Sequence, residues 1–551
     1  MPRASALLGG DDDNRFIAGS SFLIVDDFSG MRTMLSGALR NCGANPRLID
    51  LAGDSREALH LMGAKHYDVV ICDYNLGEGQ NGMQLLEEAR YRQLVGPACC
   101  WLMISADKTL ETVMETAEAQ PDAYLLKPVT EAVLAARIRR IRRRKEAFRE
   151  VNRAVLSGEY RQAISLCEER AAADRANALD LLRLKCDLML RSGQWQKARG
   201  FYEQVLAARE IPWAQLGLAR TYLAAGDPAT ACDLLEQLVS RSPNYLAAYD
   251  LLAETCDLLA MNEKAEHILE RALSLSPRSH SRQRAMGELA LALGKLERAE
   301  KAFRLAVQLA EHSVLKSPDS YLGLARVLGA RGKAQEALEI LKQMREAFDD
   351  ERAMLKARNV ECRLLEEAGE RSRAQEAARE LVQLLERCDA SALGPAAMRD
   401  IADTLLRLGE TDKALQLLRT EVMNAPEDDA NLDAVRQILH RQGLSAQGDE
   451  LVERSRQEAI EMMNSSALLS HAGDLEAAIG RMREALERMP RNVRMLLNTV
   501  HLLLSHMEQA GSDPQLVREA RRHLQSARQL APGEPRQAEL LSRLEALGST
   551  A

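Results

Sequence analysis

The chain has 551 residues and a formal net charge of −8, from 73 basic and 81 acidic side chains. At roughly 100–200 residues per domain, this length predicts several structural units and excludes a single core. The charge excludes a global positive field that would hold nucleic acid or an anionic membrane. Aromatic residues make up only 4% of the chain, which argues against a large β-sandwich or barrel and favours helices.

The N-terminal segment and the cysteines indicate the compartment. No stretch approaches the roughly 18 apolar residues of a membrane span, and residues 1–16 lack the apolar core of a secretion signal. The ten cysteines include no CxxC pair and no zinc-type cluster with histidine. We therefore expect a cytoplasmic protein with reduced, buried thiols. Residues 1–20 show no periodicity, so we expect a mobile N-terminal arm there.

From residue 21 onward, short apolar runs alternate with helical stretches. The apolar runs, typical of strands buried on both faces, are residues 21–25, 69–72, 99–104 and 123–126. The helical stretches between them include Met31–Asn41, Ser55–Met62, Met83–Tyr91 and Leu110–Glu118. This alternation predicts a doubly wound parallel sheet, an α/β domain that we place at residues 21–140.

Polar residues follow the predicted strands in a specific order. Asp26 and Asp27 follow the first strand and Asp73 follows the second, while Ser105 and Lys127 end the next two. In a doubly wound sheet these ends meet at one crevice. Converged carboxylates repel one another unless a cation neutralises them, and Mg²⁺ fits an oxygen-only set. The set suits transfer of a phosphoryl group to Asp73, with Lys127 and Ser105 contacting the phosphoryl oxygens.

Each of these residues also has a structural explanation. An aspartate after a strand is often a helix cap, and a Lys-Pro pair is usually part of a turn. The joint occurrence of all five residues at successive strand ends is hard to produce by chance, so we favour the phosphoacceptor interpretation.

The segments FLIVDDFSGMR, VVICDYNLGEGQNGMQLL, LMISAD and DAYLLKP resemble those of bacterial two-component response regulators, whose receiver domain has the flavodoxin-like fold. The domain resembles the single-domain chemotaxis receiver. The resemblance implies an upstream histidine kinase or phosphotransfer protein as phosphate donor. It also implies a metal site in which Asp26 and Asp27 are the acidic pair, with Asp27 a direct Mg²⁺ ligand. Asp73 would be the phosphorylated aspartate and a further metal ligand, and Asn75 would bind the metal through its backbone carbonyl. Ser105 and Tyr124 would be switch residues, and Lys127 the lysine joined to Pro128 by a cis bond.

The loop after Asp73 departs from this family. The sequence YNLGEGQNG is longer than the usual Met-Pro turn, so we expect this loop to fold differently. Gly82 still matches the turn glycine of the family.

After residue 130 the chain repeats a glycine followed five residues later by a small residue, at a period near 34. The anchors are Gly158/Ala163, Gly193/Ala198, Gly226/Ala231, Ala260/Ala265, Gly294/Ala299, Gly332/Ala337, Gly369/Ala374, Gly409/Ala414, Gly443/Gly448 and Gly473/Ala478. The glycine allows a sharp turn, and the alanine allows two helices to approach closely. Several units end in a proline, which stops the second helix. Such helical pairs must stack on their neighbours to bury an apolar face.

This region resembles tetratricopeptide repeats, which implies an all-α superhelix that binds peptides or partner proteins. We place the superhelix at residues 148–547, with residues 141–157 as a helical connector shared with its first repeat. The activity that the resemblance implies is binding, so we do not expect an enzyme.

Residues 137–149 carry eight basic side chains and one acidic side chain, enough to suggest an arm that binds nucleic acid. Ile138, Ile141 and Phe148 continue a helical apolar stripe through the cluster, which favours a structural helix. Residues 21–129 carry 9 basic and 15 acidic side chains and can face this helix within the same molecule.

We therefore expect a response regulator that accepts phosphate on Asp73 and controls protein binding through its repeats. Two alternatives remain open: a regulator of nucleic acid acting through residues 137–149, and a constitutive scaffold with a docking receiver.

Overall fold

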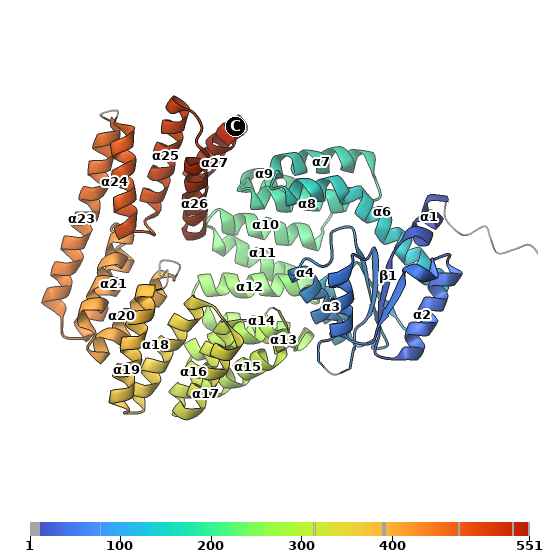
Figure 1. Cartoon of the computed structure of the whole chain (residues 1–551), viewed down its shortest axis with the longest axis horizontal. Coiled ribbons are helices and arrows are strands. Elements are labelled where there is room, and N and C mark those ends of the chain that lie inside the picture. Colours follow the sequence, from blue (N-terminus) through green and yellow to red (C-terminus); the bar gives the residue numbers. More distant parts are fainter. Residues whose placement is uncertain are drawn as a thin grey trace, which may run out of the picture. The chain divides into compact units, whose positions relative to one another are not determined.

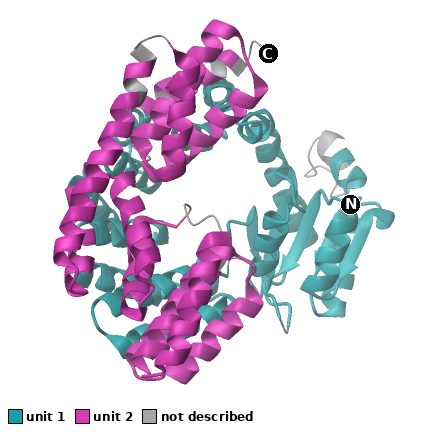
Figure 2. Ribbon diagram, turned by 60° about the vertical axis from the view of Figure 1, so that its left-hand side comes forward, with its two compact units in different colours: residues 1–320 teal, residues 321–551 magenta. Residues whose placement is uncertain are grey.

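The computed structural model describes residues 11–77, 79–311, 313–314, 316–387, 393–471, 474–531 and 534–548. The chain divides into two compact units, residues 1–320 and 321–551 (Figure 2). The first unit contains an α/β domain followed by helical pairs, and the described part of the second unit consists of helices and their connections.

A parallel sheet, of which Figure 1 labels strand β1, forms the centre of the α/β domain. It has five strands in the order β2-β1-β3-β4-β5. The strands are β1 (Phe22–Val25), β2 (Ile49–Ala52), β3 (Val69–Asp73), β4 (Cys100–Ser105) and β5 (Ala123–Leu126). The chain passes from β1 to one edge and then returns to β3 on the other side of β1, so the carboxyl ends of β1 and β3 flank the switch point where such sheets bind ligands. The predicted doubly wound α/β fold is confirmed.

Four of the five strands are predicted from the sequence, and β2 is not. β1, β3 and β4 are buried along their whole length, so they read as continuous apolar runs. β2 is an edge strand with the sequence IDLA, of which only Ala52 is buried. A short, half-exposed strand lacks the pattern that identifies its neighbours.

Helices cover both faces of the sheet. α2 (Ser29–Asn41) and α6 (Glu131–Leu156) share one apolar core with the sheet, which includes Leu35 and Leu134. α3 (Ser55–Ala64), α4 (Gly82–Tyr91) and α5 (Leu110–Ala119) cover the other face. Both faces of the central strands are thereby removed from water.

Part of the predicted mobile arm is a helix. Residues Asp11–Gly19 form α1, and residues 1–10 lie outside the described part of the chain. Ile17 is fully buried in the core shared by α2 and α6, and the Phe16 ring lies 4.4 Å from the guanidinium of Arg142. Burial of Ile17 and the contact of Phe16 with Arg142 offset the entropy of ordering the helix, so residues 11–19 form an element that the predicted mobile arm does not include.

Helix α6 belongs to two cores. It runs without interruption over 26 residues. Ile138 and Ile141 lie in the core of the α/β domain, whereas Val151 and Ala154 lie in the core of the first helical pair. The basic cluster 137–149 therefore sits on a structural helix, and some of its cations pair within the unit: Lys145 with Asp122 at 2.9 Å and Arg144 with Asp180 at 3.1 Å.

Antiparallel helical pairs make up the rest of the described chain. In the first unit these helices are α7 (Tyr160–Ala173), α8 (Ala178–Arg191), α9 (Trp195–Ala208), α10 (Pro212–Ala224), α11 (Pro228–Arg241), α12 (Leu246–Leu258), α13 (Asn262–Leu275), α14 (His280–Ala292) and α15 (Leu296–Leu309). The second unit begins within α16 (Pro318–Ala330) and continues with α17 (Ala334–Ala347), α18 (Glu351–Glu367), α19 (Arg371–Arg387), α20 (Pro395–Leu408), α21 (Thr411–Asn424), α22 (Asp429–Arg441), α23 (Ser445–His471), α24 (Leu475–Arg488), α25 (Val493–Ala510), α26 (Pro514–Leu530) and α27 (Arg536–Gly548).

The repeat anchors have the backbone geometry that the sequence predicts. The eight anchor glycines from Gly158 to Gly443 all have φ between +71° and +92°, the left-handed region where a Cβ is unfavourable. Ala260 stands in for glycine at φ +55°. Ala231 and its equivalents in the other pairs are almost fully buried between helices. Gly473, the last predicted anchor, lies outside the described residues.

Candidate functional site

The carboxyl ends of β1 and β3 bring three carboxylates together. β1 pairs with β3 so that Val25 lies opposite Cys72, which places Asp26 and Asp27 beside Asp73. One carboxylate oxygen of each aspartate lies within 4.8 Å of the others. Asp26 and Asp73 are buried, whereas Asp27 is exposed. The three predicted acidic residues therefore form one cluster that is open to solvent on the side of Asp27.

Lys127, which follows β5, bridges the two buried carboxylates. Its Nζ donates to Oδ2 of Asp73 at 2.7 Å and to Oδ2 of Asp26 at 2.9 Å. Burial raises the pKa of Asp73, and the nearby Asp26 adds to this, while the hydrogen bond from Lys127 acts in the opposite direction. Burial acts to lower the pKa of Lys127, but its two carboxylate partners outweigh this and hold the pKa above its ordinary value.

The charges of the cluster fit a divalent cation. Three carboxylates share one ammonium as their ion-pair partner, which leaves a surplus of negative charge on the carboxylates. The available donors are carboxylate oxygens, the ligands that Mg²⁺ prefers. A bound divalent ion would neutralise the surplus and would remove the repulsion between Asp27 and the two buried aspartates.

Local hydrogen bonds hold Asp26 and Asp27 in place. The backbone N–H of Phe28 donates to Oδ1 of Asp26 at 3.0 Å. Nη1 of Arg32, on α2, donates to the backbone carbonyls of Asp26 at 2.5 Å and Asp27 at 3.2 Å. These bonds fix the turn between β1 and α2. Arg32 is not among the predicted site residues, since an arginine in the first turns of a helix has no distinctive signal.

The loop after Asp73 closes on Gly82. The N–H of Gly82 donates to the carbonyl of Tyr74 at 2.8 Å, and a Cβ at Gly82 would lie 2.1 Å from the carbonyl oxygen of Asp73. Glycine is therefore required where the loop approaches β3. Gly77 takes φ +78° within the loop, and Asn75 is exposed beside it. The role of the Asn75 carbonyl as a metal ligand stays a prediction.

Ser105 and Tyr124 meet at the start of the loop after β4. Oγ of Ser105 is buried and accepts from the N–H of Asp107 at 3.1 Å. The hydroxyl of Tyr124 donates to the carbonyl of Asp107 at 2.9 Å. The Lys127–Pro128 peptide bond is cis, as the resemblance implies.

Tyr74 is a further residue of the site that the sequence analysis did not identify as functional. It follows Asp73 directly, and its hydroxyl donates to Oε2 of Glu115 on α5 at 2.7 Å. The residue next to the candidate phosphoacceptor is thus hydrogen-bonded to a helix that begins after Ser105. A tyrosine after a strand has too many ordinary roles for sequence alone to reveal this contact.

Comparisons with known proteins place the α/β domain in a family. Residues 22–139 match the model of the response regulator receiver domain. Chemotaxis protein CheY-3 of Vibrio cholerae is 34% identical over 119 residues, which cover 22% of this chain and 88% of that protein. Chemotaxis protein CheY of Pseudomonas aeruginosa is 32% identical over 119 residues, which cover 22% of this chain and 93% of that protein. The chain therefore belongs to the response regulator family through its receiver domain.

A solved structure of chemotaxis response regulator CheY4 of Vibrio cholerae is similar to 22% of this chain and 98% of its own, with 25% identity and a TM-score of 0.20. Four segments of the helical region match models of the tetratricopeptide repeat: residues 212–255, 285–313, 318–343 and 362–429. The predicted combination of a receiver with tetratricopeptide repeats is confirmed. Within the described residues, no helix combines the length and the apolarity needed to cross a membrane.

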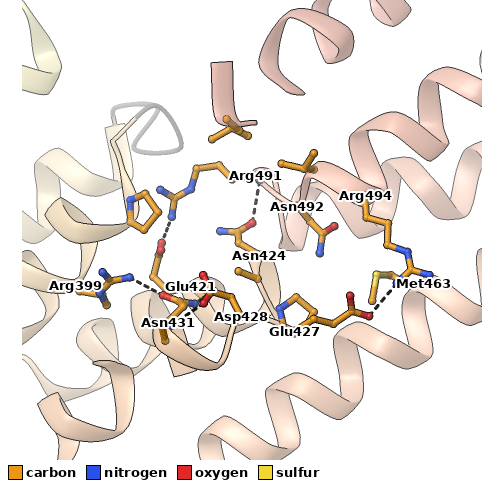
Figure 3. A pocket seen from close by; sticks show the side chains of 16 residues that line it. Arg399, Glu421, Asn424, Glu427, Asp428, Asn431, Met463, Arg491, Asn492 and Arg494 are labelled. Atoms are coloured by element: carbon orange, nitrogen blue, oxygen red, sulfur yellow. Dashed lines mark hydrogen bonds and ion pairs between the residues drawn. The ribbon is translucent and has the colours of Figure 1, made fainter. Parts of the chain in front are cut away.

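The repeats of the second unit line an open pocket (Figure 3), with a volume of about 680 Å³. Arg491 forms a buried ion pair with Glu421, whose pKa burial raises, and Arg494 pairs with Glu427 at 2.9 Å. Arg399 donates to Oδ1 of Asn431 at 2.6 Å. The three arginines and the three acidic side chains that line the pocket balance one another in charge, so the pocket carries no surplus charge that would identify a ligand.

Proposed function

We propose that this protein is a response regulator in which Asp73 accepts a phosphoryl group from a histidine kinase or phosphotransfer protein, and in which that phosphoryl group controls protein binding by the repeats. The observation that carries the proposal is the bridge from Lys127 to Asp26 and Asp73, beside the exposed Asp27. A regulatory output through binding, and not through catalysis, is what the repeats support.

The geometry supports a direct transfer. An oxygen of Asp73 would attack the phosphorus in line, forming the acyl phosphate bond as the bond to the donor histidine nitrogen breaks. Mg²⁺, held by Asp26, Asp27, Asp73 and the Asn75 carbonyl, would supply positive charge to the phosphoryl oxygens. Lys127 would exchange its contact with Asp73 for one with the phosphoryl group, and Ser105 would donate its hydroxyl to another phosphoryl oxygen.

The repeats supply the output. Stacked helical pairs present an extended surface whose side chains vary from repeat to repeat, which suits recognition of a protein or peptide. We propose that the protein acts in the cytoplasm, where a kinase would reach Asp73.

The proposed function is tested by capture of partners on the immobilised full-length chain, with Mg²⁺ and acetyl phosphate present or absent. For the wild type we expect a defined set of proteins whose recovery changes with the phosphate donor, and for Asp73→Asn we expect no change. A set that responds equally in both proteins, or in neither, would contradict phosphate control.

A further inference from the structure

Within the first unit, helix α5 of the receiver lies against the repeats. Met114 packs on the apolar core formed by α10 to α15. Glu118, one turn further along α5, accepts a hydrogen bond from Ser276 at 3.0 Å and pairs with Arg282 at the start of α14. An apolar contact and a charged contact therefore hold the same helix on the same repeat surface.

Arg282 joins two partners from different domains. Its guanidinium is buried, and it donates to both carboxylate oxygens of Asp250 on α12, at 2.6 and 2.8 Å. The remaining contact goes to Glu118 of the receiver. Loss of Glu118 would leave Arg282 paired with Asp250, so Glu118 serves the docking of the receiver and not the stacking of the repeats.

A second contact extends the docked surface to α4. Nε2 of Gln84 donates to the carbonyl of Leu309 at 3.3 Å, and Oγ of Ser313 donates to Glu87 at 3.4 Å. These two bonds are long and involve no full ion pair, so they contribute less than the pair of Glu118 with Arg282. Of these three polar contacts, the ion pair of Glu118 with Arg282 is therefore the strongest.

Two hydrogen-bonded routes connect α5 with the phosphoacceptor. Tyr74, next to Asp73, donates to Glu115 on α5 at 2.7 Å. On the other route, Ser105 accepts from the N–H of Asp107, whose carboxylate accepts from the hydroxyl of Thr112 on α5 at 2.6 Å. A displacement of Ser105 toward a phosphoryl group would pull on the first turn of α5 through Asp107. A displacement of Tyr74 at the end of β3 would act on the middle of α5 through Glu115.

We propose that α5 is a latch, which docks the receiver on the surface of α12 to α14 through Glu118 and Arg282 and is released when Asp73 carries a phosphoryl group. The proposal rests on the proposed function for its trigger, but the docked state itself does not require phosphate. Release exposes the repeat surface around Ser276 and Arg282. The continuous helix α6 keeps the receiver connected to the first repeat when α5 is released from α12 to α14.

The latch is tested by hydrogen exchange of residues 262–292 in the full-length, unphosphorylated chain, with Glu118→Gln compared with the wild type. We expect exchange there to become about tenfold faster, the factor that corresponds to the loss of one charge-assisted hydrogen bond. The matched control is Arg284→Gln. Arg284 lies on the same helix as Arg282 but pairs with Glu288 within α14 at 2.8 Å, so its loss removes only an i,i+4 pair and should raise the exchange rate by about twofold at most. Unchanged exchange in Glu118→Gln would overturn the latch.

A second arm separates the latch from its trigger. In the wild type, Mg²⁺ with beryllofluoride, a phosphate mimic, is expected to accelerate exchange over residues 262–292 as Glu118→Gln does, and Asp73→Asn is expected to abolish this effect. If exchange is faster in Glu118→Gln but the mimic does not change exchange in the wild type, the docked contact is supported and its control by phosphate is overturned. Unchanged exchange across β3 and β4 in Glu118→Gln shows that the receiver remains folded.

Discussion

Gly82→Ala is expected to destabilise the receiver severely and to displace Asp73. The Cβ of alanine would lie 2.1 Å from the carbonyl oxygen of Asp73 and 3.0 Å from the sulfurs of Cys72 and Met103. The nearest atom belongs to the backbone of β3 and cannot rotate away, so the cost should exceed the roughly 1–3 kcal/mol of ordinary overpacking. The free energy of unfolding, measured with urea, checks the loss of stability.

Gly63→Ala is the matched control for this substitution. Gly63 lies in α3 of the same domain, and a Cβ there would meet no atom within 4 Å. Since alanine is favoured over glycine in a helix by about 0.5–1 kcal/mol, this variant should keep or raise the stability. A Gly82→Ala protein as stable as Gly63→Ala would show that the loop does not need glycine.

Asp27→Ala is expected to remove most of the affinity for Mg²⁺ without harming the metal-free fold. Asp27 is exposed, and its carboxylate adds to the repulsion around Asp26 and Asp73. Its loss should therefore leave the metal-free midpoint of unfolding unchanged or higher. The affinity should fall by at least the roughly 10–100-fold that loss of an outer-sphere partner costs a metal site.

Thermal unfolding with and without Mg²⁺ measures both effects. A ligand at 100 times its Kd stabilises a protein by about 2.7 kcal/mol, so the wild type should gain stability from Mg²⁺ and Asp27→Ala should gain little. Glu159→Ala controls for the change in net charge, since the Glu159 side chain makes no capping hydrogen bond at the start of α7. An equal gain in all three proteins would contradict the assignment of Asp27 as a metal ligand.

The sequence predicts the elements that have strong local patterns. β1, β3 and β4 are continuous apolar runs because both faces are covered, and the anchor glycines recur because each turn needs a positive φ. Asp26, Asp27, Asp73 and Lys127 can be placed in one site because parallel strands end at the same edge. These inferences need only the order of the strands and the period of the repeats.

Other features depend on contacts between distant residues. The order of α1 follows from burial of Ile17 against α2 and α6, which no pattern within residues 1–20 reveals. The pair of Glu118 and Arg282 joins residues 164 positions apart and has no local signal. Ala260 takes a left-handed conformation because its repeat requires the turn, against the preference of alanine.

The central claim is tested most directly by locating the phosphoryl group on the full-length chain after incubation with Mg²⁺ and acetyl phosphate. We expect mass spectrometry to find one phosphoryl group, on the peptide that contains Asp73, and to find none on Asp73→Asn. A phosphoryl group on another residue of the wild type, or undiminished labelling of Asp73→Asn, would contradict the account.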